Sequence, residues 1–252
     1  MRRLAAVADG VYVATAVKYT TTTTVLVRPD RTCLVIDPAW TPPELDALAA
    51  DIADLEVTVT AGFATHAHQD HVLWHPGLGN AARWASPTTV ELAQRWRDEL
   101  MAALGDDLTP ELAALFGDLQ PLPGDTVPGF AIRVVTHDGH APGHSALLDD
   151  ETGVLVAGDM LSDIELPLPF DPDDLPAYLV ALDRLAPVVG EARLLVPGHG
   201  HPTTDPMARL DADRRYLDGL LHGEDAADDR RANPGMTEAH DRLLAMVRDG
   251  AV

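Results

Sequence analysis

The stretch ATHAHQDH at residues 64–71 decides how the rest of this sequence is interpreted. It follows an apolar, β-branched run that predicts a strand. In an extended chain the side chains at i and i+2 point the same way, so His66 and His68 can bind one metal ion together. Asp70 and His71 then turn toward a neighbouring ion. Imidazole and carboxylate ligands without thiolate suit Zn, Mn, Fe or Co, so this string of side chains predicts a metal site.

Eight of the 11 histidines, together with Asp70 and Asp159, come directly after four predicted strands. Loops at the strand ends of layered α/β folds converge in space and are where such folds build their sites. We therefore expect one cluster built from four loops, with too many good ligands for a single four-coordinate ion. Besides residues 64–71, the loops contribute His137, His140 and His144, then Asp159, and finally His199 and His201.

Two of these loops contain more histidines than a metal site needs. His140 and His144 could bind as the i, i+4 pair of a helical zinc site. Pro142 breaks that helix and no glutamate stands at the second position of the pattern, so we expect one ligand from this loop. The segment GHGH at residues 198–201 likewise needs only one histidine facing the metals. Three histidines are thus candidates either for hydrogen bonding behind the ligands or for a structural role: His137, His144 and His201.

Predicted strands and helices alternate along the chain. The strands are apolar enough to be covered on both faces, which indicates an α/β layered architecture rather than an all-β sandwich. Several helices should begin where a capping side chain precedes an early proline, as at Thr41, Ser86 and Asp205. We expect strands at residues 11–16, 22–27, 33–36, 57–64, 131–136, 153–157 and 194–196, and helices at residues 43–52, 87–104, 110–116, 175–185, 206–221 and 236–247.

The length of 252 residues and the hydrophobic content of 46% predict one domain that spans residues 1–252. Within it we expect a helical insert at about residues 84–122 and a C-terminal helical tail at about residues 232–252. The insert could cap a groove, or it could pack on the sheet as part of an outer layer.

The charge of the chain argues against several classes of partner. It has 18 Lys and Arg against 40 Asp and Glu, a net charge of −22, and Lys18 is the single lysine. Nucleic acids and anionic membranes require a basic footprint, so we expect neither as a partner and a small molecule as the substrate. No apolar run approaches the ~18 residues of a membrane span and the first residues lack an apolar leader, so we expect a cytoplasmic protein. Cys33 lies in an apolar run and is expected to be a buried, unreactive thiol.

The order of these motifs resembles that of the metallo-β-lactamase superfamily over about residues 10–220. The resemblance rests on residues 66–71 and on Gly139-His140, Gly158-Asp159 and Gly198-His199. It implies a four-layer αββα sandwich with a dinuclear metal site in a groove at one edge of the sheets. It also implies roles for seven residues: a first metal held by His66, His68 and His140, a second metal held by Asp70, His71 and His199, and Asp159 bridging the two.

Departures from the patterns of particular branches narrow the implied activity. The β-lactamases that have histidine at the position of His71 do not use a bridging aspartate, so Asp159 favours the glyoxalase-II-like and lactonase-like hydrolases. Gln69 stands where the flavodiiron oxygen reductases have an acidic ligand. Acyl-homoserine-lactone lactonases place a tyrosine shortly after the bridging aspartate, where this chain has Met160-Leu161-Ser162.

The resemblance therefore implies a dinuclear-metal-dependent hydrolase of a small acyl substrate, an ester, lactone or thioester, that uses a metal-bridging hydroxide. We expect two divalent ions per chain, with zinc as the leading candidate and Mn, Fe or Co as alternatives. Asp70 is the expected catalytic residue, placed to orient the hydroxide and to pass a proton. The alternatives are an iron-dependent oxidoreductase of the same fold and a β-lactam hydrolase. Residues 161–176 could form a pocket wall, as could Trp74 and His75, for which core packing is an equal alternative.

Overall fold

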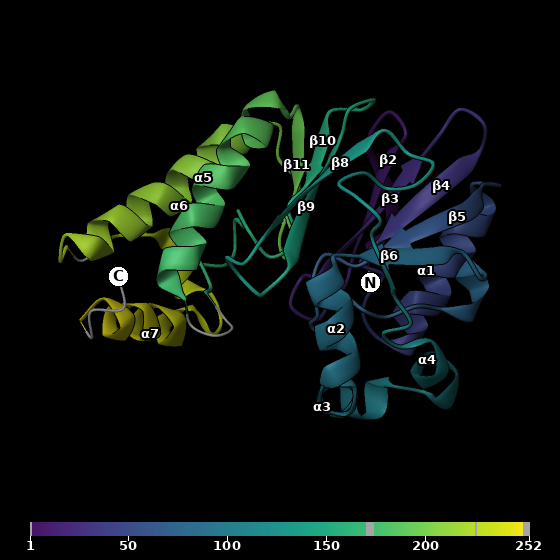
Figure 1. The fold of residues 1–252 in the computed structure, drawn as a ribbon, viewed down its shortest axis with the longest axis horizontal. Helices are drawn as coiled ribbons and strands as arrows, with labels where there is room; N and C mark the ends of the chain where they lie inside the picture. The colour runs from purple at the N-terminus through teal and green to yellow at the C-terminus, as the bar shows by residue number, and fades with distance from the viewer. Residues whose placement is uncertain (1, 170–173, 225, 249–252) are drawn as a thin grey trace.

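The computed structural model describes residues 2–169, 174–224 and 226–248 of the chain. Two β-sheets pack face to face, and helices cover the outer face of each sheet (Figure 1). An apolar cluster fills the space between the sheets, and each sheet shares a further apolar cluster with its own helices. The expected four-layer αββα sandwich is confirmed.

The first sheet contains seven strands in sequence order: β1 (Arg2–Ala8), β2 (Val11–Thr15), β3 (Thr22–Val27), β4 (Thr32–Ile36), β5 (Thr58–Phe63), β6 (Ala82–Ala85) and β7 (Gln120–Pro121). Strands β1 to β4 pair antiparallel, whereas β5 pairs parallel with both β4 and β6. Because parallel strands end at the same edge of a sheet, the residues that follow β4 and β5 lie near each other.

The second sheet contains four strands, in the order β11 (Leu194–Val196), β10 (Val154–Val156), β9 (His144–Asp149) and β8 (Ile132–His137). β9 runs antiparallel to β8 and β10, and β10 is parallel to β11. The ends of β8, β10 and β11 and the start of β9 therefore share one edge. At this edge the backbone N–H of Thr22, from the first sheet, donates to the carbonyl of Gly198 at 2.7 Å.

The helices begin at the capping residues that the sequence predicts. Thr41, Ser86 and Asp205 precede α1 (Pro42–Asp54), α2 (Pro87–Arg95) and α6 (Pro206–Leu221), and each helix starts with proline. The side chains of Ser86 and Asp205 each accept a hydrogen bond from a backbone N–H of the first turn, which satisfies a donor that the helix leaves free. The other helices are η1 (Pro76–Leu78), α3 (Arg97–Leu104), η2 (Gly105–Asp107), α4 (Pro110–Leu115), α5 (Leu175–Glu191), η3 (Asp229–Ala232) and α7 (Met236–Arg248).

Some elements differ from those that the sequence pattern predicts. Strands β1, β6 and β7 were not expected, and the single helix expected at residues 87–104 is divided at Trp96 into α2 and α3. Strands β6 and β7 have 4 and 2 residues, too few for a period of two to stand out. β1 pairs with β2 through a turn at Gly10, whose φ of +70° favours glycine.

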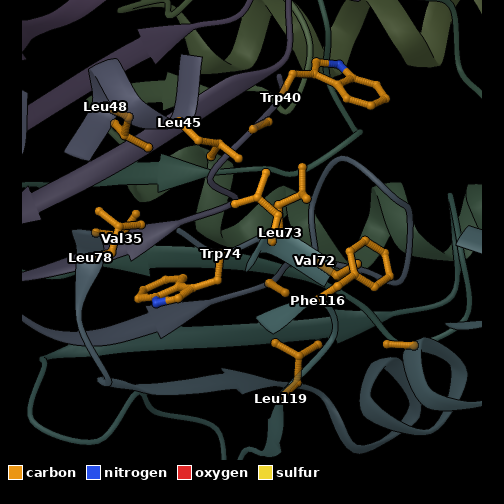
Figure 2. Packing of buried hydrophobic residues seen from close by; sticks show 14 of the residues in the cluster. Val35, Trp40, Leu45, Leu48, Val72, Leu73, Trp74, Leu78, Phe116 and Leu119 are labelled. Atoms are coloured by element: carbon orange, nitrogen blue, oxygen red, sulfur yellow. The ribbon is translucent and has the colours of Figure 1, made fainter. Parts of the chain in front are cut away.

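The helical part of the expected insert at residues 84–122 packs on the outer face of the first sheet, whereas the two ends of the insert belong to β6 and β7 of that sheet. Figure 2 shows Phe116 and Leu119 in one apolar cluster with Trp40 and Trp74. The helical part of the insert therefore forms part of an outer layer. Trp74 is 2% exposed and belongs to the same cluster, which supports the core-packing alternative for this residue.

Further sequence expectations concern the tail, the membrane and the cysteine. Helix α7 lies in the expected C-terminal tail, of which residues 249–252 lie outside the described residues, as do residues 170–173 of the stretch 161–176. No helix in the described part of the chain is both long and apolar enough to cross a bilayer. Cys33 is buried, and its burial raises the pKa of the thiol to about 12, as expected for an unreactive cysteine.

Candidate metal centre

Four loops bring seven histidine and aspartate side chains together at the edge where the sheets are joined. The side chains form two groups, and within each group one potential ligand atom of every residue lies within 4.8 Å of the others. The structure thus brings together every residue for which the sequence predicts a metal-binding role. The first group is His66, His68, His140 and Asp159, and the second group is Asp70, His71 and His199.

The first group contains three imidazole nitrogens at short mutual distances. His68 Nδ1 lies 2.9 Å from His66 Nε2 and 3.2 Å from His140 Nε2. Asp159 Oδ2 lies 3.4 Å from each of these two Nε2 atoms. A neutral imidazole has a single N–H, and His140 uses its Nδ1–H for the carbonyl of Leu168 at 2.8 Å, so these nitrogen contacts cannot all be hydrogen bonds. Lone pairs gathered in this way are the donor set that a divalent cation requires.

The contact between His71 and Asp159 also fits a cation. His71 Nε2 lies 3.2 Å from Asp159 Oδ1, and both atoms are buried with no hydrogen-bond partner among the described residues. His71 Nδ1 lies 3.0 Å from Asp37 Oδ2; an ionised carboxylate only accepts, so Nδ1 carries a proton, and in the neutral imidazole Nε2 carries a lone pair. Two buried acceptors that face each other are unfavourable unless positive charge, either a proton on His71 Nε2 or a metal ion, lies between them. The residues present therefore fit a bound metal ion.

Asp159 contacts both groups. Its Oδ2 lies 3.4 Å from His66 Nε2 and 3.1 Å from His199 Nε2, while its Oδ1 faces His71. Asp70 Oδ2 lies 3.5 Å from the Nε2 atoms of His71 and His199. The Asp159 carboxylate thus lies between the first group and the second group, where a shared ligand would have to lie.

A family comparison agrees with this geometry. A profile described as the metallo-beta-lactamase superfamily matches residues 18–215. The chain belongs to this superfamily. No curated protein matches it in sequence.

Solved structures of superfamily members share the fold. A metallo-beta-lactamase family protein from Thermus thermophilus is 23% identical, with a TM-score of 0.65 over 97% of this chain and 95% of that chain. A beta-lactamase domain protein from Burkholderia ambifaria is 19% identical, with a TM-score of 0.66 over 97% of this chain and 87% of that one. A third protein, TTHA1623, described in a di-iron-bound form, is 25% identical, with a TM-score of 0.58 over 76% of this chain and 93% of that one.

The histidines of the two groups differ in the direction of their pKa shifts. Burial lowers the pKa of His66, His68 and His140, that of His140 to about 3, which keeps these imidazoles neutral and able to donate lone pairs. Burial also acts to lower the pKa of His71 and His199, but the carboxylates beside them prevail. Asp159 is the largest of these influences, and the pKa of His199 rises to about 10. The excess negative charge that draws protons to these two imidazoles equally favours a divalent cation.

Asp37 supports the second group and was missed by the sequence analysis. It is 2% exposed, and besides His71 it accepts hydrogen bonds from the backbone N–H of Thr65 at 2.8 Å and from the Thr65 hydroxyl at 2.7 Å. Asp37 directly follows β4, and β4 is parallel to β5, whose end carries the histidine string. The sequence does show an aspartate directly after an apolar strand. That position would have indicated a place in the site only if β4 and β5 were known to be neighbours.

Three histidines of the loops lie outside both groups: His137, His144 and His201. His144 Nε2 accepts a hydrogen bond from the backbone N–H of Asp159 at 3.1 Å, and its Nδ1 lies 3.3 Å from His137 Nε2. His144 thus holds the chain that carries Asp159 instead of joining the first group. His201 is half exposed and its Nδ1 lies 3.0 Å from Asp163 Oδ2.

The turn between β2 and β3 also reaches the second group. The Thr21 hydroxyl donates to Asp70 Oδ2 at 3.1 Å, and the Tyr19 carbonyl accepts from His199 Nδ1 at 2.9 Å. These contacts leave Nε2 of His199 as the atom that faces Asp159 and Asp70. The five-threonine run at residues 20–24 gave no sign of this role, because such a run is typical of a strand end, and residues 22–24 do begin β3.

A glycine of the fourth loop allows Asp159 to reach its place. A Cβ at Gly198 would lie 2.0 Å from Asp159 Oδ1, closer than any unbonded contact. The motif glycine before His199 is therefore required by the space that the carboxylate occupies.

Proposed function

We propose that this chain is a dinuclear-metal hydrolase whose substrate is a small ester, lactone or thioester. The observation that carries the proposal is the pair of facing acceptors, His71 Nε2 and Asp159 Oδ1, buried 3.2 Å apart between two groups of ligand-type side chains. In this proposal the first group without its aspartate holds one ion, the second group holds the other, and Asp159 is shared.

The proposed cofactor is two divalent ions per chain, with zinc as the leading candidate. The histidine and carboxylate donor set contains no thiolate and is equally compatible with Mn, Fe or Co. Bound ions would act as Lewis acids, lowering the pKa of a bound water to about 7 and polarising an acyl carbonyl.

Asp70 is the proposed catalytic residue of the chain. Burial acts to raise the pKa of this carboxyl, but His71 and His199 beside it hold the pKa well below its usual range, so the group is ionised at neutral pH. The Thr21 hydroxyl donates to its Oδ2 and fixes its orientation. An ionised, oriented carboxylate beside the reacting atoms can accept the proton that hydrolysis releases from water.

The charge of the chain supports a small substrate rather than a polyanion. The net charge is −22, and the amino group of Lys18 is already paired with Asp107 at 3.3 Å. A nucleic acid would meet repulsion from the excess of acidic side chains. We therefore propose a small-molecule substrate and neither nucleic acid nor membrane as a partner.

An iron-dependent oxidoreductase is the second candidate, because the neighbour TTHA1623 is described in a di-iron-bound form. Gln69 opposes it, since the flavodiiron relatives have an acidic ligand at this position. A β-lactam hydrolase is a further alternative, opposed by the placement of Asp159 between the two groups.

The experiment combines metal analysis with a substrate panel. Protein purified without added metal is analysed for bound elements, then assayed with thioesters, lactones, aryl esters and a chromogenic β-lactam, and for oxygen consumption. We expect about two ions per chain and turnover of at least one acyl substrate. Iron as the dominant bound metal, with oxygen consumed and none of the acyl substrates turned over, would overturn the hydrolase proposal in favour of the oxidoreductase.

A further inference from the structure

The segment at residues 162–168, which we call the arch, hydrogen bonds to one histidine of each group. At its start the Ser162 hydroxyl donates to the carbonyl of His199 at 2.7 Å. At its end the carbonyl of Leu168 accepts from His140 Nδ1 at 2.8 Å. The arch therefore orients the imidazole of His140 in the first group and fixes the backbone of His199 in the second group.

The arch is held from its other side by the C-terminal part of the chain. Arg230 Nη1 donates to the carbonyl of Ser162 at 3.0 Å and to the carbonyl of Glu165 at 2.9 Å. Asn233 Nδ2 donates to the carbonyl of Ile164 at 2.7 Å. These partners come from η3 and the residues just after it, beyond residue 215 where the superfamily match ends.

Arg230 is itself fixed by two carboxylates, of which that of Asp213 is buried. Its side chain is 8% exposed and pairs with Asp213 of α6 at 2.6 Å and with Asp228 at 2.8 Å. Asp213 also accepts a hydrogen bond from the backbone N–H of Leu161, two residues after Asp159. A planar guanidinium has five donors in a rigid fork, so one side chain can hold both the carboxylates and the two arch carbonyls.

We propose that Arg230 is a positioning residue for the metal centre. It fixes the arch, the arch fixes the Leu168 carbonyl, and that carbonyl keeps the proton of His140 on Nδ1 and the lone pair on Nε2. The inference rests on the proposed function only in taking His140 and His199 as metal ligands. Loss of a partner behind a ligating histidine typically weakens metal binding by about 10 to 100-fold.

The test separates positioning from folding stability. Arg230→Met alone would leave Asp213 as a buried unpaired charge, so it is combined with Asp213→Asn, which is neutral and keeps an acceptor for the Leu161 N–H. Arg230→Lys keeps the charge but lacks the fork that reaches two carbonyls. The matched control is Arg214→Met, an arginine of α6 that pairs with Asp183 at 2.6 Å on the surface.

Zn²⁺ affinity is measured by competition with a chromogenic chelator, the Co²⁺ absorption spectrum reports the ligand geometry, and thermal unfolding of the metal-free proteins reports stability. We expect the double variant to unfold cooperatively, to bind Zn²⁺ about 10 to 100-fold more weakly than the parent, and to give an altered Co²⁺ spectrum. Arg230→Lys should weaken binding less, and Arg214→Met should match the parent.

A folded double variant with parental Zn²⁺ affinity and an unchanged Co²⁺ spectrum would overturn the inference. If the double variant does not fold, Arg230→Lys with parental affinity and spectrum overturns it in the same way. A parent that binds two ions but turns over none of the panel would refute the proposed function and leave this comparison intact. A parent that binds no Zn²⁺ would overturn the inference as well.

Discussion

Asp37 Oδ2 accepts a hydrogen bond from His71 Nδ1 at 3.0 Å, and both side chains are buried. The contact places a proton on Nδ1, so in the neutral imidazole the lone pair is on Nε2 and points into the second group. Asp46 and His75 form a pair of the same length, but Asp46 is 71% exposed and lies outside both groups. The same two residue types thus support the candidate metal centre in one place and lie near the surface in the other.

The first prediction concerns Asp37. Replacing it with alanine removes the acceptor of His71 and of the Thr65 hydroxyl and N–H, so Zn²⁺ affinity should fall by about 10 to 100-fold. Chelator competition measures the effect. Asp46→Ala is the matched control and should bind Zn²⁺ as the parent does. Equal affinities for the parent and Asp37→Ala would contradict the supporting role assigned to Asp37.

The second prediction concerns the shared carboxylate. Asp159→Ala removes the carboxylate that contacts ligand-type side chains of both groups, and two bound cations would then lack their shared ligand. Bound metal should fall from about two ions per chain to one or fewer, and turnover of any panel substrate should fall to background. Elemental analysis and the acyl-substrate assay check this. If Asp159→Ala hydrolyses as well as the parent, the proposed bridge is wrong.

The local part of the site could be predicted from the sequence. His66, His68, Asp70 and His71 are neighbours in the chain, so their spacing alone indicated that they act together. The other loops were assigned from strand ends and from the resemblance. The structure brings these residues to the same edge of the sandwich.

The parts that the sequence did not predict depend on contacts between distant segments. Predicting the role of Asp37 would have required knowing that β4 and β5 are parallel neighbours. Predicting the role of Thr21 would have required knowing that the two sheets are joined at Gly198. Predicting the role of Arg230 would have required knowing both the path of the arch and the burial of Asp213 on α6. Polar side chains that act over such separations leave no periodic signal in the sequence.

The third prediction concerns Gly198. An alanine Cβ at this position would lie 2.0 Å from Asp159 Oδ1, so the carboxylate or the backbone must move. Gly198→Ala should lower the free energy of unfolding by about 1–3 kcal/mol and weaken metal binding. Gly124→Ala is the control, because a Cβ there meets nothing within 4 Å. Denaturant unfolding and chelator competition measure both effects, and parental values for Gly198→Ala would show that the packing argument fails.

The fourth prediction concerns the pH dependence of stability. His137 is 4% exposed, and burial lowers its pKa to about 4, below the ordinary value of about 6.5. Between these pH values the unfolded chain binds more protons than the folded chain, so the free energy of unfolding falls as the pH falls from about 6.5 to about 4. The shift corresponds to about 3 kcal/mol for this residue.

Denaturant unfolding at several pH values, with chelator present so that metal release does not contribute, measures the slope. His137→Asn keeps an acceptor for the Gly139 N–H and should make the slope shallower between about pH 4 and 6.5. His222→Asn is the control, because His222 is an exposed histidine just after α6. In this variant the free energy of unfolding should still fall on acidification. An unchanged slope for His137→Asn would mean that His137 is not the group that resists protonation.

The last prediction separates ligands from other histidines in the same loops. His140 and His199 belong to the two groups, whereas His144 accepts from the Asp159 N–H and His201 pairs with Asp163. His140→Ala and His199→Ala should each lose one bound ion and all measurable turnover, because each removes a direct donor.

His144→Ala should keep both ions, with a metal affinity or turnover rate about 10 to 100-fold lower than that of the parent. The substitution removes the acceptor of the Asp159 N–H but leaves the Asp159 carboxylate in the chain. His201→Ala should be closest to the parent, since this side chain is 45% exposed. Each of the four variants is assayed for bound metal and for turnover of the panel substrate that works. If His144→Ala loses an ion while His140→Ala keeps both, the ligand of that loop is His144. The contact between His140 Nδ1 and Leu168, on which the arch argument depends, would then have to be reinterpreted.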